Sequence, residues 1–327
     1  MAAGERYEPC VLCGSRAVAL DCSISLRGKL EVDVTECRAC GLLFANPVPS
    51  AERIASLYDS GYWDPEGRGA REASRRYRRQ YRFGAAYGER LGRAARTGRM
   101  LEVGCGLGLF LKGVADHCGW EVEGIDAAEG VGRFAREKLG LRVTEMPFEQ
   151  NGFPDDSFDL VRAKDVLEHV PRPMEFLGEA RRILRPGGEL EVWLPNGPLD
   201  LAEARRAFRR GARAEMGAGH LLFIRPRTLR AALEAAGFGV ARMEVSGFRY
   251  ALKALGLWPA RPAPKPAGAE AQAETGPGLE QWERPPAERG LKGRAWYARL
   301  REWRSRHPAL PAWLPLGFRQ RVVARKR

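Results

Sequence analysis

The stretch LEVGCGLGLF, residues 101–110, places three glycines at alternate positions directly after an apolar run. Those glycines are Gly104, Gly106 and Gly108. Residues 99–103 are expected to form a buried strand and residues 109–118 a helix, so the glycines join a strand to a helix. Glycine allows a tight turn and lets a ligand approach the main chain closely. The stretch therefore predicts a ligand-binding turn in a doubly wound α/β sheet.

The residues around the glycines argue against two common ligands. A dinucleotide fingerprint needs its third glycine at position 109, where this chain has leucine, and no Gly-Lys-Ser/Thr of a phosphate loop follows. Glu102 precedes the glycines, and a carboxylate there would repel a pyrophosphate but attract a cation. We therefore expect a ligand with positive charge near the turn and an adenosine beyond it. S-adenosylmethionine has a sulfonium, an ammonium and no phosphate.

From about residue 99 to residue 246 the chain resembles the class I methyltransferases. The succession SFDLV, VLEHV and LRPGG, within residues 157–188, is similar to small-molecule methyltransferases of the ubiquinone and menaquinone type, and more closely to bacterial members with an N-terminal zinc ribbon. Together with NPVPS, LYDSGYW and GHLLFIRPRTLRAALEAAGF, the match covers most of residues 10–246. The resemblance implies an S-adenosylmethionine-dependent methyltransferase with a seven-stranded Rossmann-like sheet.

The resemblance also suggests which residues hold the cofactor. Asp126 ends a second expected strand, where its carboxylate can accept hydrogen bonds from both ribose hydroxyls, and a third short strand would bring Glu145 and Met146 near the adenine. The family's usual aspartate is missing from that third strand. The expected cofactor-binding residues are Glu102, Gly104, Cys105, Gly106, Gly108, Asp126, Ala127, Glu145, Met146 and Lys164.

Two histidines are candidates for a general base. Methyl transfer can proceed largely by alignment of the reactants, but an oxygen acceptor must still lose its proton. His169 follows the fourth expected strand and His220 precedes LLFIRP, so both are expected at the sheet edge where doubly wound folds bind ligands. The alternative for each is a histidine that only orders a loop by hydrogen bonding.

Two C-x2-C-G turns near the N-terminus predict a metal site. They are CVLCG at residues 10–14 and CRACG at residues 37–41. Four thiolates would close a tetrahedral shell without an open position, which is typical of structural zinc. The expected ligands are Cys10, Cys13, Cys37 and Cys40. The alternative is that these are unpaired thiols of the core.

The chain divides into five expected segments. A class I sheet still lacks one strand after residue 246, and RQRVVARKR at the end is the candidate for it. A disordered basic tail is the alternative. The segments are a zinc ribbon (1–48), a helical lid or connector (49–98), the cofactor-binding core (99–246), an insertion with a Pro/Ala-rich linker and an amphipathic helix at 291–307 (247–318), and the final strand (319–327).

Composition narrows the function only in part. The net charge of +13 over 327 residues fits nucleic acid or an anionic membrane surface, but an arginine-rich composition alone can produce it. No signal peptide and no transmembrane segment is expected, which favours a cytoplasmic protein. The main hypothesis is methylation, at oxygen, of a small molecule or of a cell-envelope saccharide or lipid-linked acceptor. An RNA methyltransferase and an inactive cofactor-binding subunit are the alternatives, and contact of the amphipathic helix with a membrane remains open.

Overall fold

The computed structural model describes residues 7–57, 70–95, 97–128, 130–246 and 319–327. The insertion expected for residues 247–318, including its linker and its helix, lies outside the described residues. Part of the expected lid, residues 58–69, also lies outside them. The division of the chain into five segments stays a prediction.

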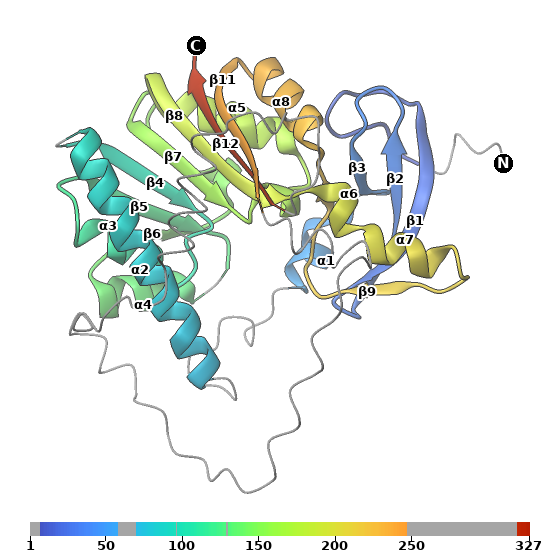
Figure 1. Ribbon diagram of the computed structural model, residues 1–327, viewed down its shortest axis with the longest axis horizontal. Helices are drawn as coiled ribbons and strands as arrows, with labels where there is room; N and C mark the ends of the chain where they lie inside the picture. The colour runs from blue at the N-terminus through green and yellow to red at the C-terminus, as the bar shows by residue number, and fades with distance from the viewer. Residues whose placement is uncertain (1–6, 58–69, 96, 129, 247–318) are drawn as a thin grey trace, which may run out of the picture. The chain divides into compact units, whose positions relative to one another are not determined.

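A seven-stranded sheet forms the centre of the protein, with the strand order β11-β12-β8-β7-β4-β5-β6. The five strands from β6 to β8 run parallel, whereas β12 pairs antiparallel with both β8 and β11 (Figure 1). The C-terminal residues thus supply the seventh strand, and the predicted seven-stranded α/β fold is confirmed. The strands are β4 (Arg99–Val103), β5 (Glu121–Asp126), β6 (Arg142–Glu145), β7 (Phe158–Lys164), β8 (Leu184–Pro195), β11 (Phe238–Ser246) and β12 (Arg319–Lys326).

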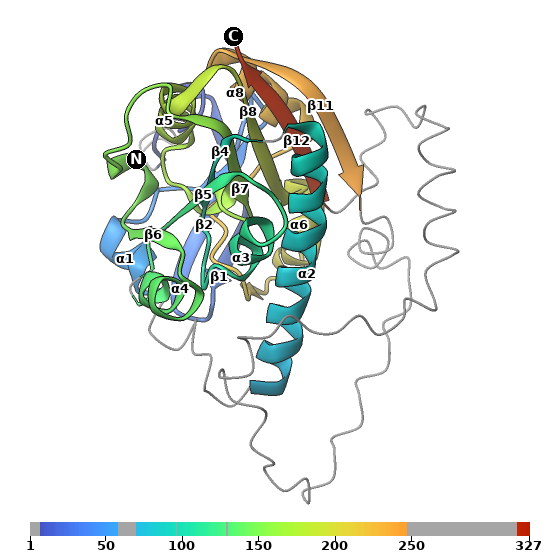
Figure 2. The same cartoon turned by 90° about the vertical axis from the view of Figure 1, so that its left-hand side faces the viewer.

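Helices follow most of these strands. Helix α2 runs alongside α3, and glycines permit this close approach, since a Cβ at Gly84 would lie 2.0 Å from the main-chain oxygen of Phe110 (Figure 2). None of the helices in the described ranges combines the length and the hydrophobicity needed to cross a bilayer. The helices are α1 (Ala51–Ala55), α2 (Ala70–Ala94), α3 (Leu109–Ala115), α4 (Val131–Leu139), α5 (Pro173–Ile183), α6 (Gly197–Asp200), α7 (Ala202–Phe208) and α8 (Pro226–Ala235), with single 3-10 turns η2 (Phe148–Gln150) and η3 (Leu167–His169).

A second, five-stranded sheet contains the N-terminal residues, with the order β10-β3-β2-β1-β9. Its three inner strands come from the N-terminal region, but both edge strands come from the segment between β8 and α8. One hydrophobic core joins this sheet to the central sheet, and it includes Phe44 from β3 and Phe223 from β10. The strands are β1 (Val18–Leu26), β2 (Leu30–Cys37), β3 (Leu43–Ala45), β9 (Ala214–Met216) and β10 (Leu222–Phe223).

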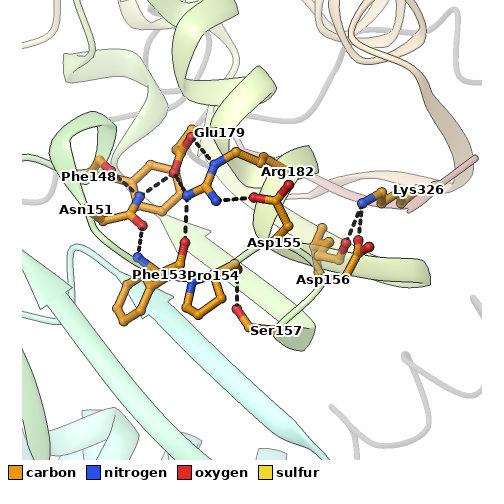
Figure 3. A network of polar contacts seen from close by, with 11 residues as sticks. Phe148, Asn151, Phe153, Pro154, Asp155, Asp156, Ser157, Glu179, Arg182 and Lys326 are labelled. Atoms are coloured by element: carbon orange, nitrogen blue, oxygen red, sulfur yellow. Dashed lines mark hydrogen bonds and ion pairs between the residues drawn. The ribbon is translucent and has the colours of Figure 1, made fainter.

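A polar network fixes the edge of the central sheet where β7 begins and β12 ends (Figure 3). Arg182 at the end of α5 donates hydrogen bonds to Asp155 at 2.5 Å and to Glu179 at 2.9 Å. Lys326 donates from Nζ to Asp156 at 2.5 Å and to the main-chain oxygen of Leu184 at 2.6 Å. The Lys326 contacts tie the end of β12 to this edge, which lies opposite the glycine-rich turn.

Candidate functional site

The glycine-rich turn connects β4 to α3 at the carboxyl edge of the sheet. Gly104, Gly106 and Gly108 have φ values of 69°, 53° and 76°, a region that favours glycine. A Cβ at Gly104 would lie 2.4 Å from Cγ2 of Val166, and one at Gly108 would lie 2.8 Å from Cδ1 of Leu141. No larger residue fits these two positions without displacing its neighbours. The turn lies next to the point where the strand order reverses, where ligands of such sheets bind, and its Gly104 is exposed whereas Gly106 and Gly108 are buried.

Asp126 ends β5 beside this turn, with Ala127 directly after it. Its Oδ2 accepts a hydrogen bond from the Gly106 amide at 2.8 Å, and its Oδ1 accepts one from the Ala128 amide at 2.9 Å. Burial raises the pKa of Asp126, although both amide hydrogen bonds oppose that shift. The carboxylate that was expected to bind ribose is thus fixed at the turn.

Glu102 lies in a row of charged side chains that crosses three strands. Strand pairing sets Arg162 of β7 between Glu102 of β4 and Glu191 of β8. Arg162 donates from Nη1 to Glu102, and its guanidinium lies 3.9 Å from the ring centroid of Phe110. Burial raises the pKa of Glu102 to about 7, while the positive charge of Arg162 opposes the shift. The carboxylate before the turn therefore forms an ion pair with Arg162, a residue that sequence reasoning missed.

The remaining expected cofactor residues have other contacts. Cys105 is buried inside the turn. Glu145 accepts hydrogen bonds from the amides of Gly132 and Arg133, at 2.7 and 3.1 Å, and so caps the start of α4. The amide of Met146 donates to the main-chain oxygen of Asp126 at 3.0 Å, which holds Met146 next to Asp126. Contact of these residues with an adenine stays a prediction.

Lys164 ends β7 and contacts the next residue. Its Nζ donates to Asp165 at 2.5 Å, and Arg319 from β12 donates to the same carboxylate at 2.9 Å. Asp165 has a φ of 56°, and both cations lower its pKa, although burial opposes them. The contact brings the C-terminal strand to the edge of the site.

The two candidate bases lie together, directly after β7 and before β10. The rings of His169 and His220 stack edge to face, with centroids 4.9 Å apart. Nδ1 of His169 lies 2.9 Å from the main-chain oxygen of Gly219, and Nδ1 of His220 lies 2.6 Å from Oδ2 of Asp200. The first contact orders a loop, whereas the second pairs an imidazole with a carboxylate.

Glu168 completes this group, and its carboxylate lies within 4.8 Å of a ring nitrogen of each histidine. It is 1% exposed, and its Oε1 lies 3.9 Å from Nε2 of His220. Burial raises the pKa of Glu168 to about 8 and lowers the pKa of His169 to about 4. Burial also acts against a charged His220, but the hydrogen bond and charge of Asp200 hold the pKa of His220 above its ordinary value. Of the two histidines, His220 has the environment of a proton acceptor.

Four cysteine sulfurs meet at one end of the N-terminal sheet. They belong to Cys10, Cys13, Cys37 and Cys40, and all of them lie within 4.8 Å of one another. Two of the sulfur pairs, Cys10 with Cys40 and Cys13 with Cys37, are each 3.6 Å apart. A tetrahedral zinc ion with Zn–S bonds of about 2.3 Å sets its sulfurs about 3.8 Å apart. The arrangement fits the structural zinc expected from the sequence.

Comparison with known proteins identifies the family. A family model described as a methyltransferase domain matches residues 74–242, more than half of the chain. The chain belongs to this methyltransferase family. The match covers the glycine-rich turn, the end of β5 and the histidine pair, whereas the four cysteines lie outside it. The methyl donor of the methyltransferase is S-adenosylmethionine, as the turn predicted.

Several curated methyltransferases are similar to the chain. A ubiquinone biosynthesis O-methyltransferase of Paramagnetospirillum magneticum is 30% identical over 224 residues, which cover 61% of this methyltransferase and 86% of that enzyme. A ubiquinone biosynthesis O-methyltransferase of Ruegeria pomeroyi is 37% identical over 95 residues, 28% of this chain and 38% of that enzyme. A phosphatidylethanolamine N-methyltransferase of Cereibacter sphaeroides is 37% identical over 105 residues, 30% of this chain and 51% of that enzyme. The chain thus spans less than two thirds of the latter two enzymes.

Among solved structures, an S-adenosylmethionine-dependent methyltransferase from Archaeoglobus fulgidus covers 75% of this chain and 94% of its own, with 17% identity and a TM-score of 0.42. A likeness at this TM-score adds nothing to what the strand order already shows about the fold.

Sequence reasoning missed three functional candidates: Arg162, Glu168 and Asp200. Arg162 interrupts the apolar run from Leu160 to Ala163 inside the strand FDLVRAK, and a charged residue at such a place is a signal for a buried ion pair. Glu168 stands next to a predicted base, in VLEHV, but nothing local to the sequence announces its burial. Asp200 gives no signal at all, because its partner His220 is 20 residues further along the chain, beyond α7 and β9.

Proposed function

We propose that this methyltransferase transfers a methyl group from S-adenosylmethionine to a hydroxyl oxygen of a small molecule. The observation that carries the proposal is the 2.6 Å contact between His220 and Asp200, next to the buried Glu168. A hydroxyl must lose a proton when its oxygen is methylated, and a positioned base contributes about 10² to 10⁴ in rate. The similarity to two ubiquinone biosynthesis O-methyltransferases supports oxygen as the attacked atom.

The glycine-rich turn and the end of β5 would hold the donor. Gly104 leaves the main chain exposed at the sheet edge, and Asp126 offers a carboxylate fixed by the amide of Gly106. When bound, S-adenosylmethionine supplies a methyl group on a cationic sulfur. The protein's task is then to orient the acceptor and to remove one proton. Orientation alone can contribute roughly 7 to 11 kcal/mol.

His220 is the proposed base, and His169 the proposed loop-ordering residue. His220 would take the hydroxyl proton at Nε2, since its Nδ1 lies against Asp200. His169 lies against Gly219 O through its Nδ1, and burial holds the pKa of His169 at about 4, far below neutral pH. A base with so low a pKa gains little driving force for proton removal.

The narrower proposals concern the acceptor, the metal and the location. A cell-envelope saccharide or lipid-linked acceptor remains our expectation within the small-molecule class, and the similarity to a phosphatidylethanolamine N-methyltransferase supports a lipid-linked one. We also propose a structural zinc ion at the four cysteines, because their sulfur spacing fits a tetrahedron. None of the seven cysteines of the chain, all of which lie in its described part, is placed in a disulfide, which supports a cytoplasmic location.

The test is transfer of a labelled methyl group to defined acceptors. Purified full-length protein with its bound metal is incubated with [methyl-³H]S-adenosylmethionine and, separately, a catechol, a sugar nucleotide, a host lipid extract and host ribosomal RNA. We expect label in one of the hydroxyl-bearing small molecules or lipids, with the methyl group on oxygen by mass spectrometry. His220→Asn is expected to lower kcat by about 10² or more, and His169→Asn by much less.

Two results would contradict the proposal. Label recovered only in RNA would assign the protein to the nucleic-acid class. Equal kcat for the His220→Asn and wild-type proteins would show that alignment alone suffices and that no base acts here.

A further inference from the structure

His220 is held between two carboxyl groups that come from different elements. Asp200, at the end of α6, lies 2.6 Å from Nδ1, and Glu168 in η3 lies 3.9 Å from Nε2. The side chains of His220 and Asp200 are each 12% exposed, and that of Glu168 is 1% exposed. Neither oxygen of Glu168 has a hydrogen-bond partner among the residues that the structure describes. Buried polar atoms without such a partner are uncommon and point to a missing ligand or water.

The main chain around His220 is tightly fixed. The amide of Leu221 donates to the main-chain oxygen of Glu168 at 2.8 Å, and the oxygen of Leu221 accepts from the amide of Ala45 in β3, also at 2.8 Å. A Cβ at Gly197 would lie 2.0 Å from the carbonyl carbon of Phe223, so α6 is pressed directly against β10. The distance from Asp200 to His220 is therefore set by two packed elements and the N-terminal sheet.

The spacing between His220 and Glu168 suits one bridging oxygen. An oxygen about 2.8 Å from both Nε2 and Oε1 is a normal hydrogen-bond partner for each of them. At 3.9 Å apart, these two atoms are close enough to share it. A hydroxyl at this point would give its proton to the imidazole and would satisfy the orphaned carboxyl group.

We infer that Asp200 is a positioning residue that accepts a hydrogen bond from Nδ1–H of His220, so that Nε2 faces Glu168 and receives the proton of an acceptor hydroxyl bound between them. The inference rests on the proposed function. The O–H bond of the acceptor breaks, the proton moves to Nε2, and the oxygen keeps the electron pair that bonds the methyl carbon. The resulting imidazolium lies against the Asp200 carboxylate, which stabilises its charge.

The charges that face His220 come from three elements. Asp200 acts from α6, Asp165 from just after β7 and Glu168, when it is ionised, from η3, and each of these negative charges favours the charged imidazole. His169 stacks on the ring, and its own pKa of about 4 keeps it neutral near pH 7. Asp200 is the only one of these groups that the structure shows in a hydrogen bond with His220. Removing its charge should therefore have the largest effect on the histidine.

The experiment is a pH titration of the histidines by NMR in full-length protein labelled with ¹⁵N-histidine. The chain has four histidines, so His220 is assigned by the signal lost in His220→Asn. We expect Asp200→Asn to lower the pKa of His220 by about 1 to 3 pH units, the usual effect of losing a close opposite charge. Asp200→Glu should restore part of that shift. Glu203→Gln is the matched control, because Glu203 lines the same surface cavity as Asp200 without contacting the ring.

Turnover with the acceptor found above provides the second measurement. Asp200→Asn is expected to lower kcat by about 10² with little change in KM, and to move the acid limb of the pH profile with the pKa of His220. Glu203→Gln should leave both unchanged. A kcat and pH profile that Asp200→Asn does not alter would overturn the inference even where methyl transfer occurs.

The two hypotheses can fail separately. An Asp200-dependent shift of His220 without transfer to any hydroxyl acceptor would refute the proposed function, and with it the catalytic part of the inference. Should Asp200→Asn not fold, the tautomer decides in the wild-type protein. A neutral His220 protonated at Nδ1 supports the inference, and one protonated at Nε2 overturns it.

Discussion

Glu168→Gln should make the folded protein less sensitive to alkaline pH, because it replaces a buried carboxyl group with a neutral group of the same shape. Burial raises the pKa of Glu168 from an ordinary 4.5 to about 8. The folded state therefore prefers the neutral acid, and the stability that this preference provides is complete below pH 4.5. It is lost as the pH rises toward 8, where ionisation must occur inside the protein.

The size of the effect follows from the same two values. A tenfold change in an equilibrium constant corresponds to about 1.4 kcal/mol, so full ionisation of Glu168 costs the folded protein about 5 kcal/mol. Folded domains are stable by only about 5 to 15 kcal/mol, so a cost of this size is readily measured. Glutamine cannot ionise, and Glu168→Gln escapes the cost entirely.

The assay is urea unfolding followed by tryptophan fluorescence at pH 5 and pH 9, with zinc present throughout. We expect the free energy of unfolding of Glu168→Gln, relative to wild type, to rise by several kcal/mol between the two pH values. Any change in hydrogen bonding made by the amide is the same at both and cancels. Glu137→Gln, at an exposed position of α4, is the control and should show no such rise. A pH-independent difference for Glu168→Gln would refute the assignment of a buried, neutral carboxyl group.

Three further predictions concern the turn, the cysteines and the last strand. Gly104→Ala should destabilise the fold by about 1 to 3 kcal/mol and weaken binding of S-adenosylmethionine in calorimetry, and unchanged binding would argue against the turn as the donor site. Cys37→Ser or chelation should remove the bound zinc. Because β3 pairs with β10, loss of the zinc should also bring the pKa of His220, measured by NMR, back toward its ordinary value. An unchanged His220 pKa in the metal-free protein would disprove this coupling. Deleting residues 319–327 should leave β11 without its partner strand and β8 paired only with β7, and so abolish cooperative melting; a soluble truncated protein with a sharp transition would contradict that expectation.

The sequence was most informative where local chemistry determines structure. Three alternate glycines after an apolar run predict the turn between β4 and α3, because few other sequences can adopt those backbone angles. The paired Cys-x2-Cys-Gly motifs predict a cluster of sulfurs for a similar reason. The C-terminal strand was accessible only through the family resemblance, since RQRVVARKR alone does not reveal that it enters the sheet between two strands far away in the chain.

The contacts that sequence reasoning missed depend on the register of distant segments. Glu102 and Arg162 are 60 residues apart, and only the pairing of β4 with β7 sets them side by side. Asp200 meets His220 because the segment between β8 and α8 folds back onto the N-terminal sheet through strands of three and two residues. Strands so short carry no usable periodicity, so neither the strands nor the contact between the two side chains could be anticipated.

The N-terminal sheet takes both of its edge strands, β9 and β10, from a late part of the chain, and this has a consequence for biosynthesis. On the ribosome, β1, β2 and β3 emerge early, but β9 and β10 follow only after most of the cofactor-binding sheet has been translated. Until then the outer hydrogen-bonding groups of β1 and β3 have no strand to pair with, and such open edges attract other chains. A nascent polypeptide stalled before residue 214 should therefore need a chaperone more than the finished protein does.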